Sequence, residues 1–281
     1  MVNVLVTGGS GFIGTELVKQ LVKEHTVSAF DLTLGDVSGV DYYQVNLIDK
    51  HRLSALVGEI KPDLVYHLGG KIRGTDEELY QNNVLGTKNL LEVYSGRVVF
   101  MSSGLVYQGQ VAPYTEDMVL QTQDPMGKTK LLCERLLLER KNTAVVRASV
   151  VYGSGQKGPM FVSSLKDFLS RRDGSFRMTL GEQKRDFLHV DDLTRALLIL
   201  QREEFTGVFN IAFGVSIPMR DVITLSKEIV GDFPVDFSLP YRDRELWDYA
   251  FAIDKARNVL GWQPLIDLQR GLEETFSTLR P

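Results

Sequence analysis

The chain has 281 residues, of which 43% are hydrophobic and 24% are charged, an ordinary composition for a folded globular protein. Its 32 basic and 36 acidic residues give a formal charge of −4, which argues against nucleic acid as the main partner. No apolar run approaches the roughly 20 residues of a membrane span, and the first residues lack the basic region of a signal peptide. The single cysteine, Cys133, and four scattered histidines predict a cytoplasmic protein without a disulfide or a metal cluster.

The first half of the sequence alternates strand-like and helix-like segments. Residues 2–7 form a continuous apolar run rich in β-branched side chains, which is typical of a strand buried on both faces. Apolar residues at helical spacing follow at 15–23, and a second apolar run spans 26–30. Further strands are expected at 64–68, 98–101 and 144–146, with helices at 84–94 and 130–139. Strands that alternate with helices predict an α/β fold with a doubly wound parallel sheet.

The residue composition changes after Arg147, where glycine-rich connections separate short apolar segments. Such segments often recognise substrates. A helix expected at 191–200 and a strand at 208–212 return to the main sheet. The sequence therefore predicts a dinucleotide-binding domain made of residues 1–148 and 187–212. A smaller, mostly C-terminal substrate-binding domain would consist of residues 149–186 and 213–281.

A glycine-rich turn lies between the first expected strand and the first expected helix, with the spacing Gly9-x-Gly11-x-x-Gly14. Glycines at this spacing permit a tight turn, a close approach of the backbone to a pyrophosphate and close helix packing. Asp31 follows 20 residues after Gly11, at the end of the second expected strand. A carboxylate there accepts hydrogen bonds from a ribose and repels a 2′-phosphate. The pattern therefore predicts a site for NAD rather than NADP.

Seven motifs carry a resemblance that runs from end to end of the chain. They are TGGSGFIG at 7–14, DLVYHLGG at 63–70, NVLGTKNLLE at 83–92, SSGLVY at 102–107, PMGKTKLLCE at 125–134, RDFLHVDDLTRAL at 185–197 and LGWQPLIDLQRGLEET at 260–275. Together they resemble the extended short-chain dehydrogenase/reductase superfamily, and within it the NAD-dependent epimerase/dehydratase family that acts on nucleotide-activated sugars. The resemblance implies a Rossmann NAD domain with a smaller nucleotide-sugar domain.

The resemblance also implies a set of cofactor-binding residues. They are Gly8, Gly11, Phe12, Ile13, Gly14, Asp31, Asn46, Leu47, Leu68, Gly69, Gly70, Asn83 and Lys130. In the matching positions, Asn46 and Leu47 flank the adenine, and Asn83 supports the active site. The family usually has an aspartate where this chain has Asn46, but a neutral amide still bonds the adenine edge.

The catalytic residues implied by the resemblance are a serine, a tyrosine and a lysine, which match Ser103, Met126 and Lys130. In the family the tyrosine takes the proton of a sugar hydroxyl, usually at C4, while the hydride passes to NAD. Free tyrosine has a pKa near 10, so a neighbouring ammonium must lower it. The thioether of Met126 cannot exchange a proton. Ser103, Lys130, Tyr107 or an ordered water is therefore expected to replace the missing group.

Several reactions remain compatible with this unusual site. Inverting UDP-N-acetylglucosamine 4,6-dehydratases also carry methionine at the position of Met126, so methionine does not exclude turnover. Dehydratases place Asp-Lys or Asp-Glu after the Ser/Thr, whereas this chain has Gly104 and Leu105, which cannot act as acid or base across C5 and C6. We therefore expect an epimerase that acts by C4 oxidoreduction. The alternatives are a 4-ketosugar reductase, an atypical dehydratase, or an inactive protein that binds NAD and a nucleotide sugar.

The substrate and assembly are also implied by matching positions. Arg185 and Arg242 match residues that contact the diphosphate of a nucleotide sugar, which arginine binds through two parallel hydrogen bonds. Relatives usually have a substrate-contacting asparagine where this chain has Val150. The helices expected at 84–94 and 128–140 match the four-helix dimer interface of relatives, so a homodimer is expected.

Overall fold

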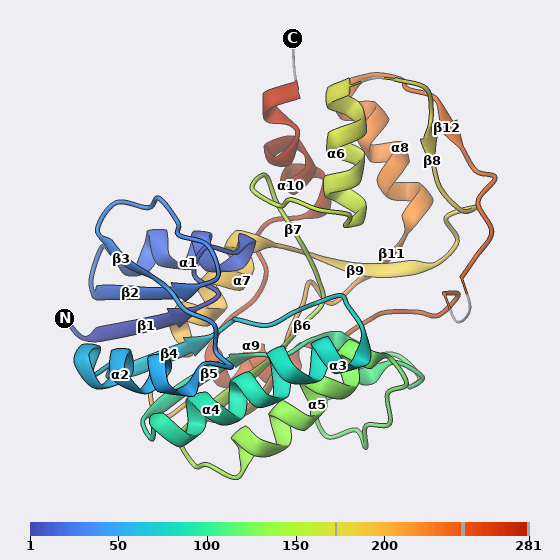
Figure 1. Ribbon diagram of the computed structural model, residues 1–281. Helices are drawn as coiled ribbons and strands as arrows, with labels where there is room; N and C mark the ends of the chain where they lie inside the picture. Colours follow the sequence, from blue (N-terminus) through green and yellow to red (C-terminus); the bar gives the residue numbers. More distant parts are fainter. Residues whose placement is uncertain (172, 243–244, 280–281) are drawn as a thin grey trace.

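The computed structural model describes residues 1–171, 173–242 and 245–279 (Figure 1). The first elements are β1 (Asn3–Thr7), α1 (Phe12–Leu21), β2 (Thr26–Asp31), β3 (Val40–Gln44), α2 (Lys50–Ile60), β4 (Leu64–His67), α3 (Asp76–Leu79), the π-helix η1 (Tyr80–Leu85), α4 (Gly86–Val93), β5 (Arg97–Met101), the 3₁₀ helix η2 (Gly104–Tyr107) and α5 (Pro125–Leu138). The remaining elements are β6 (Thr143–Ala148), β7 (Val150–Tyr152), α6 (Phe161–Arg171), β8 (Phe176–Arg177), β9 (Lys184–His189), α7 (Val190–Ile199), β10 (Gly207–Ile211), β11 (Ser216–Pro218), α8 (Met219–Val230), β12 (Val235–Asp236), α9 (Asp254–Leu260), α10 (Leu268–Thr275) and the 3₁₀ helix η3 (Ser277–Leu279).

The main sheet has seven strands in the order β3-β2-β1-β4-β5-β6-β10, and every pair is parallel. The strand order reverses between β1 and β4, so the sheet is doubly wound, which confirms the predicted fold class. The predicted return of residues 208–212 is also confirmed, because β10 pairs with β6. Ligands of open α/β sheets bind at the carboxyl ends of the strands where the order reverses. The fold therefore directs attention to the ends of β1 and β4.

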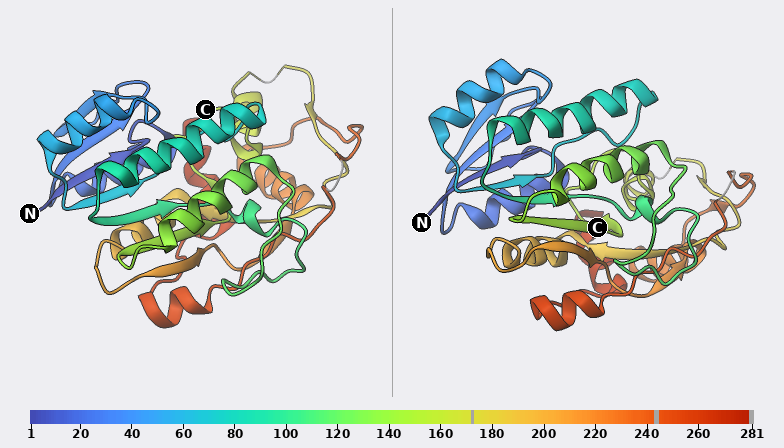
Figure 2. Two further views of the ribbon diagram at one scale, coloured as in Figure 1. Left: turned by 60° about the horizontal axis from the view of Figure 1, so that its bottom comes forward. Right: turned by 90° about the horizontal axis from the view of Figure 1, so that it is seen from below.

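Helices cover both faces of this sheet, as the alternation of side chains along β1 requires. Val4 and Val6 pack in a core with α1 and α7, whereas Leu5 packs in a core with α2, α4 and α5 (Figures 1 and 2). The hydrophobic pattern of the sequence did not predict β3 or α2. Strand β3 lies at the edge of the sheet with none of its five residues buried, so it lacks the apolar run that marks the inner strands.

A second lobe stands beside the carboxyl ends of the main strands. It contains the three-stranded sheet β11-β9-β7 and the helices α6, α8 and α10, which enclose a separate core (Figure 1). We propose the two-domain division predicted from the sequence, although β9 runs through 187–189 in this small sheet. Among the described residues, no helix combines the length and the apolar character needed to cross a bilayer.

Candidate active site

The glycine-rich turn joins β1 to α1 with almost no free space around it. Gly8 has φ +73°, and a Cβ added there would lie 2.8 Å from the amide nitrogen of Gly69 at the end of β4. A Cβ added to Gly14 would lie 2.1 Å from the carbonyl oxygen of Gly8. No side chain caps α1 at Gly11, so the first amide groups of the helix are available to an anion. This cradle fits a pyrophosphate.

Asp31 is held beside this turn at the end of β2. Its Oδ2 accepts a hydrogen bond from the backbone N–H of Ser10 at 3.0 Å, and its Oδ1 accepts one from Leu32 at 2.7 Å. A carboxylate has further acceptor capacity on both oxygens. The predicted ribose-binding residue is therefore fixed in orientation next to the predicted phosphate cradle.

A buried histidine ties together the elements that form the floor of the site. Nδ1 of His67 lies 2.7 Å from Thr7 Oγ1, and Nε2 lies 2.9 Å from Thr87 Oγ1. Thr7 Oγ1 also accepts a hydrogen bond from the Gly69 N–H at 3.1 Å. Burial, with the positive charge of Lys130, lowers the pKa of His67 to about 3. The neutral ring thus links β1, β4 and α4.

Gly70, Asn83 and Lys130 meet at one point beyond β4. The Asn83 amide donates to the Lys71 carbonyl at 3.0 Å and to Thr129 Oγ1 at 2.9 Å. A Cβ added to Gly70 would lie 2.9 Å from Asn83 Oδ1 and 3.4 Å from Lys130 Nζ. The structure therefore brings together three cofactor positions that are dispersed along the sequence.

The other predicted cofactor contacts occupy the rim of this region. Leu47 lies against the glycine path, with its Cδ1 3.3 Å from a Cβ added to Gly69. Asn46 is exposed, and its Oδ1 accepts from the Ile48 N–H at 3.2 Å, which leaves its NH₂ group for an adenine. Ile13 and Leu68 pack against the core beneath the turn. The ring of Phe12 faces Gly153 and Gly155 of the second lobe.

Ser103, Met126 and Lys130 lie on two elements that pack together. Ser103 follows β5 and begins η2, where its Oγ accepts from the Leu105 N–H at 3.2 Å. A Cβ added to Gly127 would lie 2.7 Å from the Leu105 carbonyl oxygen, so the first turn of α5, which carries Met126, abuts η2. Lys130 is buried one turn later and donates from Nζ to the Met101 carbonyl at 2.8 Å.

The electrostatic setting of Lys130 is unusual for an ammonium group. Burial lowers the pKa of Lys130 from its ordinary value, because the charged form loses its hydration. Its Nζ lies 4.9 Å from the ring centroid of Phe100. A desolvated ammonium at this position orients hydrogen-bond acceptors. It also stabilises a negative charge that develops nearby during a reaction.

Tyr107 has a different environment from that expected of a proton carrier. Its hydroxyl donates to Asn210 Oδ1 at 2.8 Å and accepts from Arg147 Nη1 at 2.7 Å. The ring is fully buried and stacks on Tyr114 with 4.9 Å between centroids. Burial raises the pKa of Tyr107 to about 12. These contacts favour a structural role that ties η2 to β6 and β10.

The two predicted diphosphate ligands both lie next to the 245–249 segment. Arg185 donates from Nη1 to the Trp247 carbonyl and from Nη2 to the Glu245 carbonyl, both at 3.1 Å. Its guanidinium lies over the Trp247 ring at 5.2 Å. Burial lowers the pKa of Arg185, and arginine has five N–H donors, so donors remain for a phosphate. Arg242 is exposed, and its backbone N–H donates to Glu245 Oε2 at 2.8 Å.

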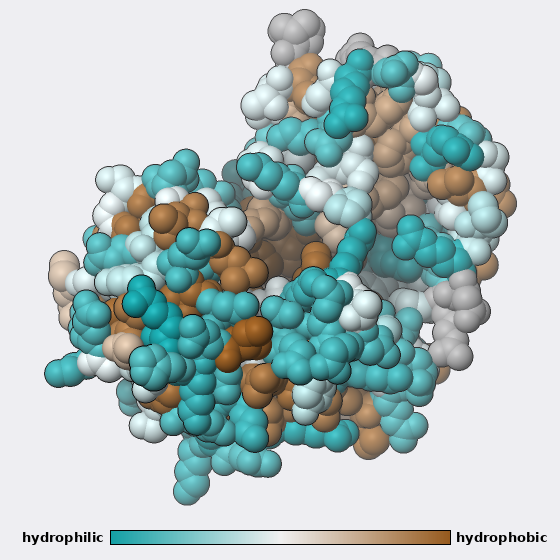
Figure 3. Space-filling model, viewed as in Figure 1, coloured by the Kyte–Doolittle hydropathy of each residue, from teal (hydrophilic) through white to brown (hydrophobic). Residues whose placement is uncertain are grey.

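Figure 3 shows that this face of the molecule is hollowed between the two lobes, with apolar residues inside the hollow. The predicted cofactor residues come from the lobe of the main sheet, and Arg185 and Arg242 come from segments of the other lobe. Ligand sites commonly form where two domains face each other. The hollow therefore has the position expected for a site shared between cofactor and substrate.

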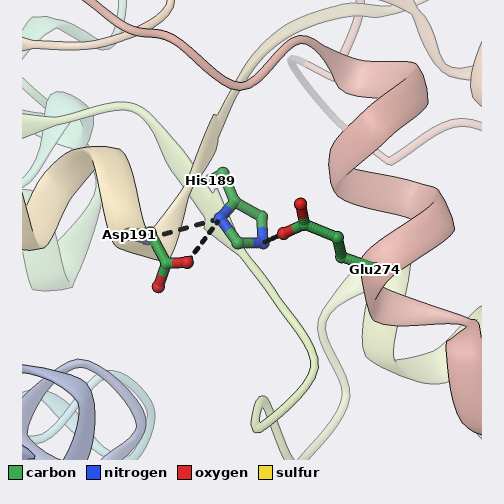
Figure 4. Close-up of side chains that lie close together, drawn as sticks. All are labelled: His189, Asp191 and Glu274. Atoms are coloured by element: carbon green, nitrogen blue, oxygen red, sulfur yellow. Dashed lines mark hydrogen bonds and ion pairs between the residues drawn. The ribbon is translucent and has the colours of Figure 1, made fainter.

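His189, Asp191 and Glu274 form a separate cluster where β9, α7 and α10 meet (Figure 4). The His189 ring is buried, with Nδ1 3.8 Å from Asp191 Oδ2 and Nε2 3.9 Å from Glu274 Oε2. The two carboxylates thus approach different ring nitrogens, whereas a single metal ion needs its ligands around one point. Nδ1 of His189 also accepts a hydrogen bond from the Asp191 N–H at 3.4 Å, so the ring caps the start of α7 and has a structural role.

A doubly wound parallel sheet with a glycine turn after β1 and an acid after β2 defines a dinucleotide-binding α/β protein. The sequence pattern of the NAD dependent epimerase/dehydratase family matches residues 4–212, and the chain belongs to this family. It is an NAD-dependent enzyme, and the cradle at Gly8 and Gly14 with Asp31 beside it fits that cofactor.

Relatives of the chain cover almost its whole length. It is 30% identical to GDP-6-deoxy-D-mannose reductase of Pseudomonas aeruginosa, over 97% of this chain and 95% of the relative. It is 27% identical to a putative UDP-glucose 4-epimerase of Methanocaldococcus jannaschii, over 99% of this chain and 98% of the relative. MoeE5 in complex with UDP-glucuronic acid and NAD superposes with a TM-score of 0.91, at 29% identity over 98% of each chain. UDP-glucose 4-epimerase of Thermotoga maritima with UDP-glucose gives a TM-score of 0.90 at 28% identity, over 98% of this chain and 97% of the other.

Proposed function

We propose that the protein is an NAD-dependent nucleotide-sugar epimerase that acts by C4 oxidoreduction, with an atypical site at Ser103, Met126 and Lys130. The observation that carries this proposal is the position of Lys130. Its buried Nζ lies 3.4 Å from a Cβ added to Gly70, directly beyond the cofactor cradle, and the 3₁₀ turn that Ser103 begins packs against the same helix. Several relatives are named as 4-epimerases of UDP-glucose or UDP-glucuronate.

Each residue of the candidate site has a separate role in such a reaction. The glycine turn holds the pyrophosphate, Asp31 accepts from the adenosine ribose, and Lys130 orients the nicotinamide ribose. Bound NAD would supply a reversible hydride acceptor for C4 of the sugar. The Ser103 hydroxyl donates a hydrogen bond to the sugar oxygen, and the buried Lys130 ammonium stabilises the negative charge that develops there.

A 4-ketosugar reductase is the second candidate function. Met126 cannot take a proton from a hydroxyl, which weakens oxidation more than reduction when a donor is nearby. The reductase of Pseudomonas aeruginosa and a dTDP-4-dehydro-6-deoxyglucose reductase of Escherichia coli, 26% identical over 99% of this chain, are both reductases by name. The two candidates differ in whether a nucleotide sugar alone changes configuration.

The test follows reduced-nicotinamide absorbance while UDP, dTDP, GDP and CDP sugars are added to the NAD-loaded protein, with products examined by NMR. A C4 epimer, or a rise in absorbance, supports hydride removal from C4. Consumption of NADH with a 4-ketosugar, without any epimer, selects the reductase. The Lys130→Ala variant is expected to lose turnover in either case. Binding of NAD and nucleotide sugar without any turnover, not restored by Met126→Tyr, would contradict both and leave a binding protein.

The same residues support proposals for the substrate, the assembly and the compartment. We infer a nucleoside diphosphate sugar held in part by Arg185 and Arg242, and a homodimer formed through α4 and α5, which lie side by side in both views of Figure 2. Leu132 and Leu138 of α5 are 38% and 42% exposed, as expected for a face that a second copy covers. Leu132→Glu should shift the sedimentation coefficient to that of a monomer. The single buried thiol, Cys133, is compatible with the cytoplasm.

A further inference from the structure

The hydroxyl end of Tyr249 lies directly against the residue that follows Ser103. A Cβ added to Gly104 would lie 2.2 Å from the Tyr249 hydroxyl oxygen and 2.8 Å from its Cζ. Tyr249 reaches this place from the C-terminal segment, where it pairs with Arg185 through a parallel β-bridge. Position 104 therefore accommodates only glycine while Tyr249 is present. The phenol occupies the space in which a side chain at position 104 would begin.

Two further observations relate this hydroxyl to the first turn of α5, which carries Met126. The first turn of α5 abuts η2, because a Cβ added to Gly127 would lie 2.7 Å from the Leu105 carbonyl oxygen. Asp124, which caps α5 and precedes Met126 by two residues, is one of the charges that act on the Tyr249 hydroxyl. The Tyr249 hydroxyl therefore lies against η2, and the first turn of α5, which carries Met126, packs against the same 3₁₀ helix.

Tyr249 also differs from its aromatic neighbours in having an unused hydroxyl. The Tyr107 hydroxyl is bonded to Asn210 and Arg147, and the Tyr114 hydroxyl donates to the Asp248 carbonyl at 2.9 Å. Within the described part of the chain, no hydrogen bond is formed by the Tyr249 hydroxyl, although the residue is only 5% exposed. Its hydroxyl oxygen is not fully buried, so solvent still reaches this atom. A buried polar group in this state is suited to a ligand.

The surroundings of Tyr249 keep its phenol protonated. Burial raises the pKa of Tyr249 well above its ordinary value, and the charges of Tyr114, Asp186 and Asp124 act in the same direction. The Arg185 guanidinium, 5.9 Å from the ring centroid, acts in the opposite direction. At neutral pH the group is therefore a proton donor. This state matches the proton requirement of ketone reduction.

We propose that Tyr249 donates the proton to the sugar oxygen in the reduction step, in place of the group missing at Met126, an inference that rests on the proposed function. In the reducing direction, a dihydronicotinamide delivers a hydride to the carbonyl carbon and the carbonyl electron pair moves to the oxygen. That oxygen takes the proton of the Tyr249 O–H bond, and the phenolate regains a proton from solvent.

The experiment compares Tyr249→Phe with Tyr114→Phe, each of which removes one hydroxyl from the same aromatic cluster. General acid–base groups contribute roughly 100-fold or more to rate. With UDP-glucose or UDP-glucuronic acid as the probe, Tyr249→Phe should lower kcat by about 100-fold or more with little change in NAD affinity. Tyr114→Phe should keep most of the wild-type kcat. An active wild type with an equally active Tyr249→Phe variant would overturn this inference alone, whereas an inactive wild type would overturn the proposed function and this inference with it.

A change in the acidity of the Tyr249 phenol distinguishes a catalytic role from a purely structural one. Replacing Tyr249 with 3-fluorotyrosine keeps the ring and the hydroxyl but makes the phenol more acidic. If the phenol donates the proton, the more acidic phenol raises the rate of the reduction step while NAD affinity stays constant. A rate equal to that of the wild type would overturn the assignment, because a packing residue does not transmit its acidity to the rate.

Discussion

The Arg147 guanidinium and the Glu134 carboxylate form a forked ion pair beneath the candidate active site. Arg147 Nη2 lies 2.7 Å from Glu134 Oε2, and Nε lies 3.1 and 3.2 Å from the two carboxylate oxygens. Both side chains are almost fully buried. The Ser102 hydroxyl donates to the same carboxylate. Glu134 is one turn after Lys130 on α5, so the pair fixes the helix that carries Lys130 against β5 and β6.

Removing one member of this pair should be more damaging than removing both. A buried charge without its partner costs about 3–5 kcal/mol, whereas replacement of both by apolar side chains is often close to neutral. We expect Glu134→Leu and Arg147→Met each to lower the free energy of unfolding by about 3–5 kcal/mol. The double variant should lose less than either single variant. Urea denaturation of all four proteins measures this, and additive losses would show that the two charges are not coupled.

The inner elements could be predicted from the sequence because burial on both faces leaves a continuous apolar run, as in β1 and β4. The edge strand β3 could not, since its side chains are partly exposed. The glycine turn and Asp31 were predictable because their spacing is local. Tyr107 and Tyr249 show the limit of such reasoning. Sequence spacing does not reveal that one hydroxyl is already bonded, or that the other reaches Gly104 from 145 residues farther along the chain.

The cofactor cradle gives a prediction about Gly14. A Cβ there would lie 2.1 Å from the Gly8 carbonyl oxygen, so Gly14→Ala must displace α1 from the turn and misplace its amide groups. We expect NAD affinity to fall by about tenfold or more, which is about 1.4 kcal/mol. Isothermal titration calorimetry measures the change. The matched control is Gly58→Ala in α2, where a Cβ meets nothing within 4 Å. That variant should keep wild-type NAD affinity and gain about 0.5–1 kcal/mol of stability, and equal NAD losses in both variants would refute the steric argument.

Asp31 should determine the choice between NAD and NADP. Its carboxylate is oriented by the Ser10 and Leu32 amides, and hydrogen bonds to charged groups contribute about 1.5–3 kcal/mol. Asp31→Ala is expected to weaken NAD binding by about 10-fold to 100-fold while NADP binding is unchanged or improved. Fluorescence titration with both cofactors measures the ratio. Asp36→Ala removes a similar charge from an exposed position and should leave the ratio unchanged. An unchanged ratio in the Asp31 variant would place the ribose elsewhere.

His67 should make stability depend on pH in acid. Its folded-state pKa of about 3 lies below the ordinary histidine value of 6.5, so the unfolded chain binds a proton before the folded chain does. Stability from this group is complete above about pH 6.5 and falls by about 1.4 kcal/mol per pH unit below it, until the pH approaches the folded-state value.

The measurement compares the wild type with His67→Gln, which retains hydrogen-bonding groups for Thr7 and Thr87 but cannot titrate. Above pH 7 the wild type should be the more stable protein in urea, because Gln fits the site less well than the ring. Between pH 6.5 and 4.5 the difference should shrink by about 1.4 kcal/mol per unit. The exposed His51 gives the control, since His51→Gln should follow the wild type at every pH. A constant difference between wild type and His67→Gln would mean that the ring is protonated in the folded protein. Thr7 and Thr87 would then both act as acceptors for a charged imidazolium next to Lys130.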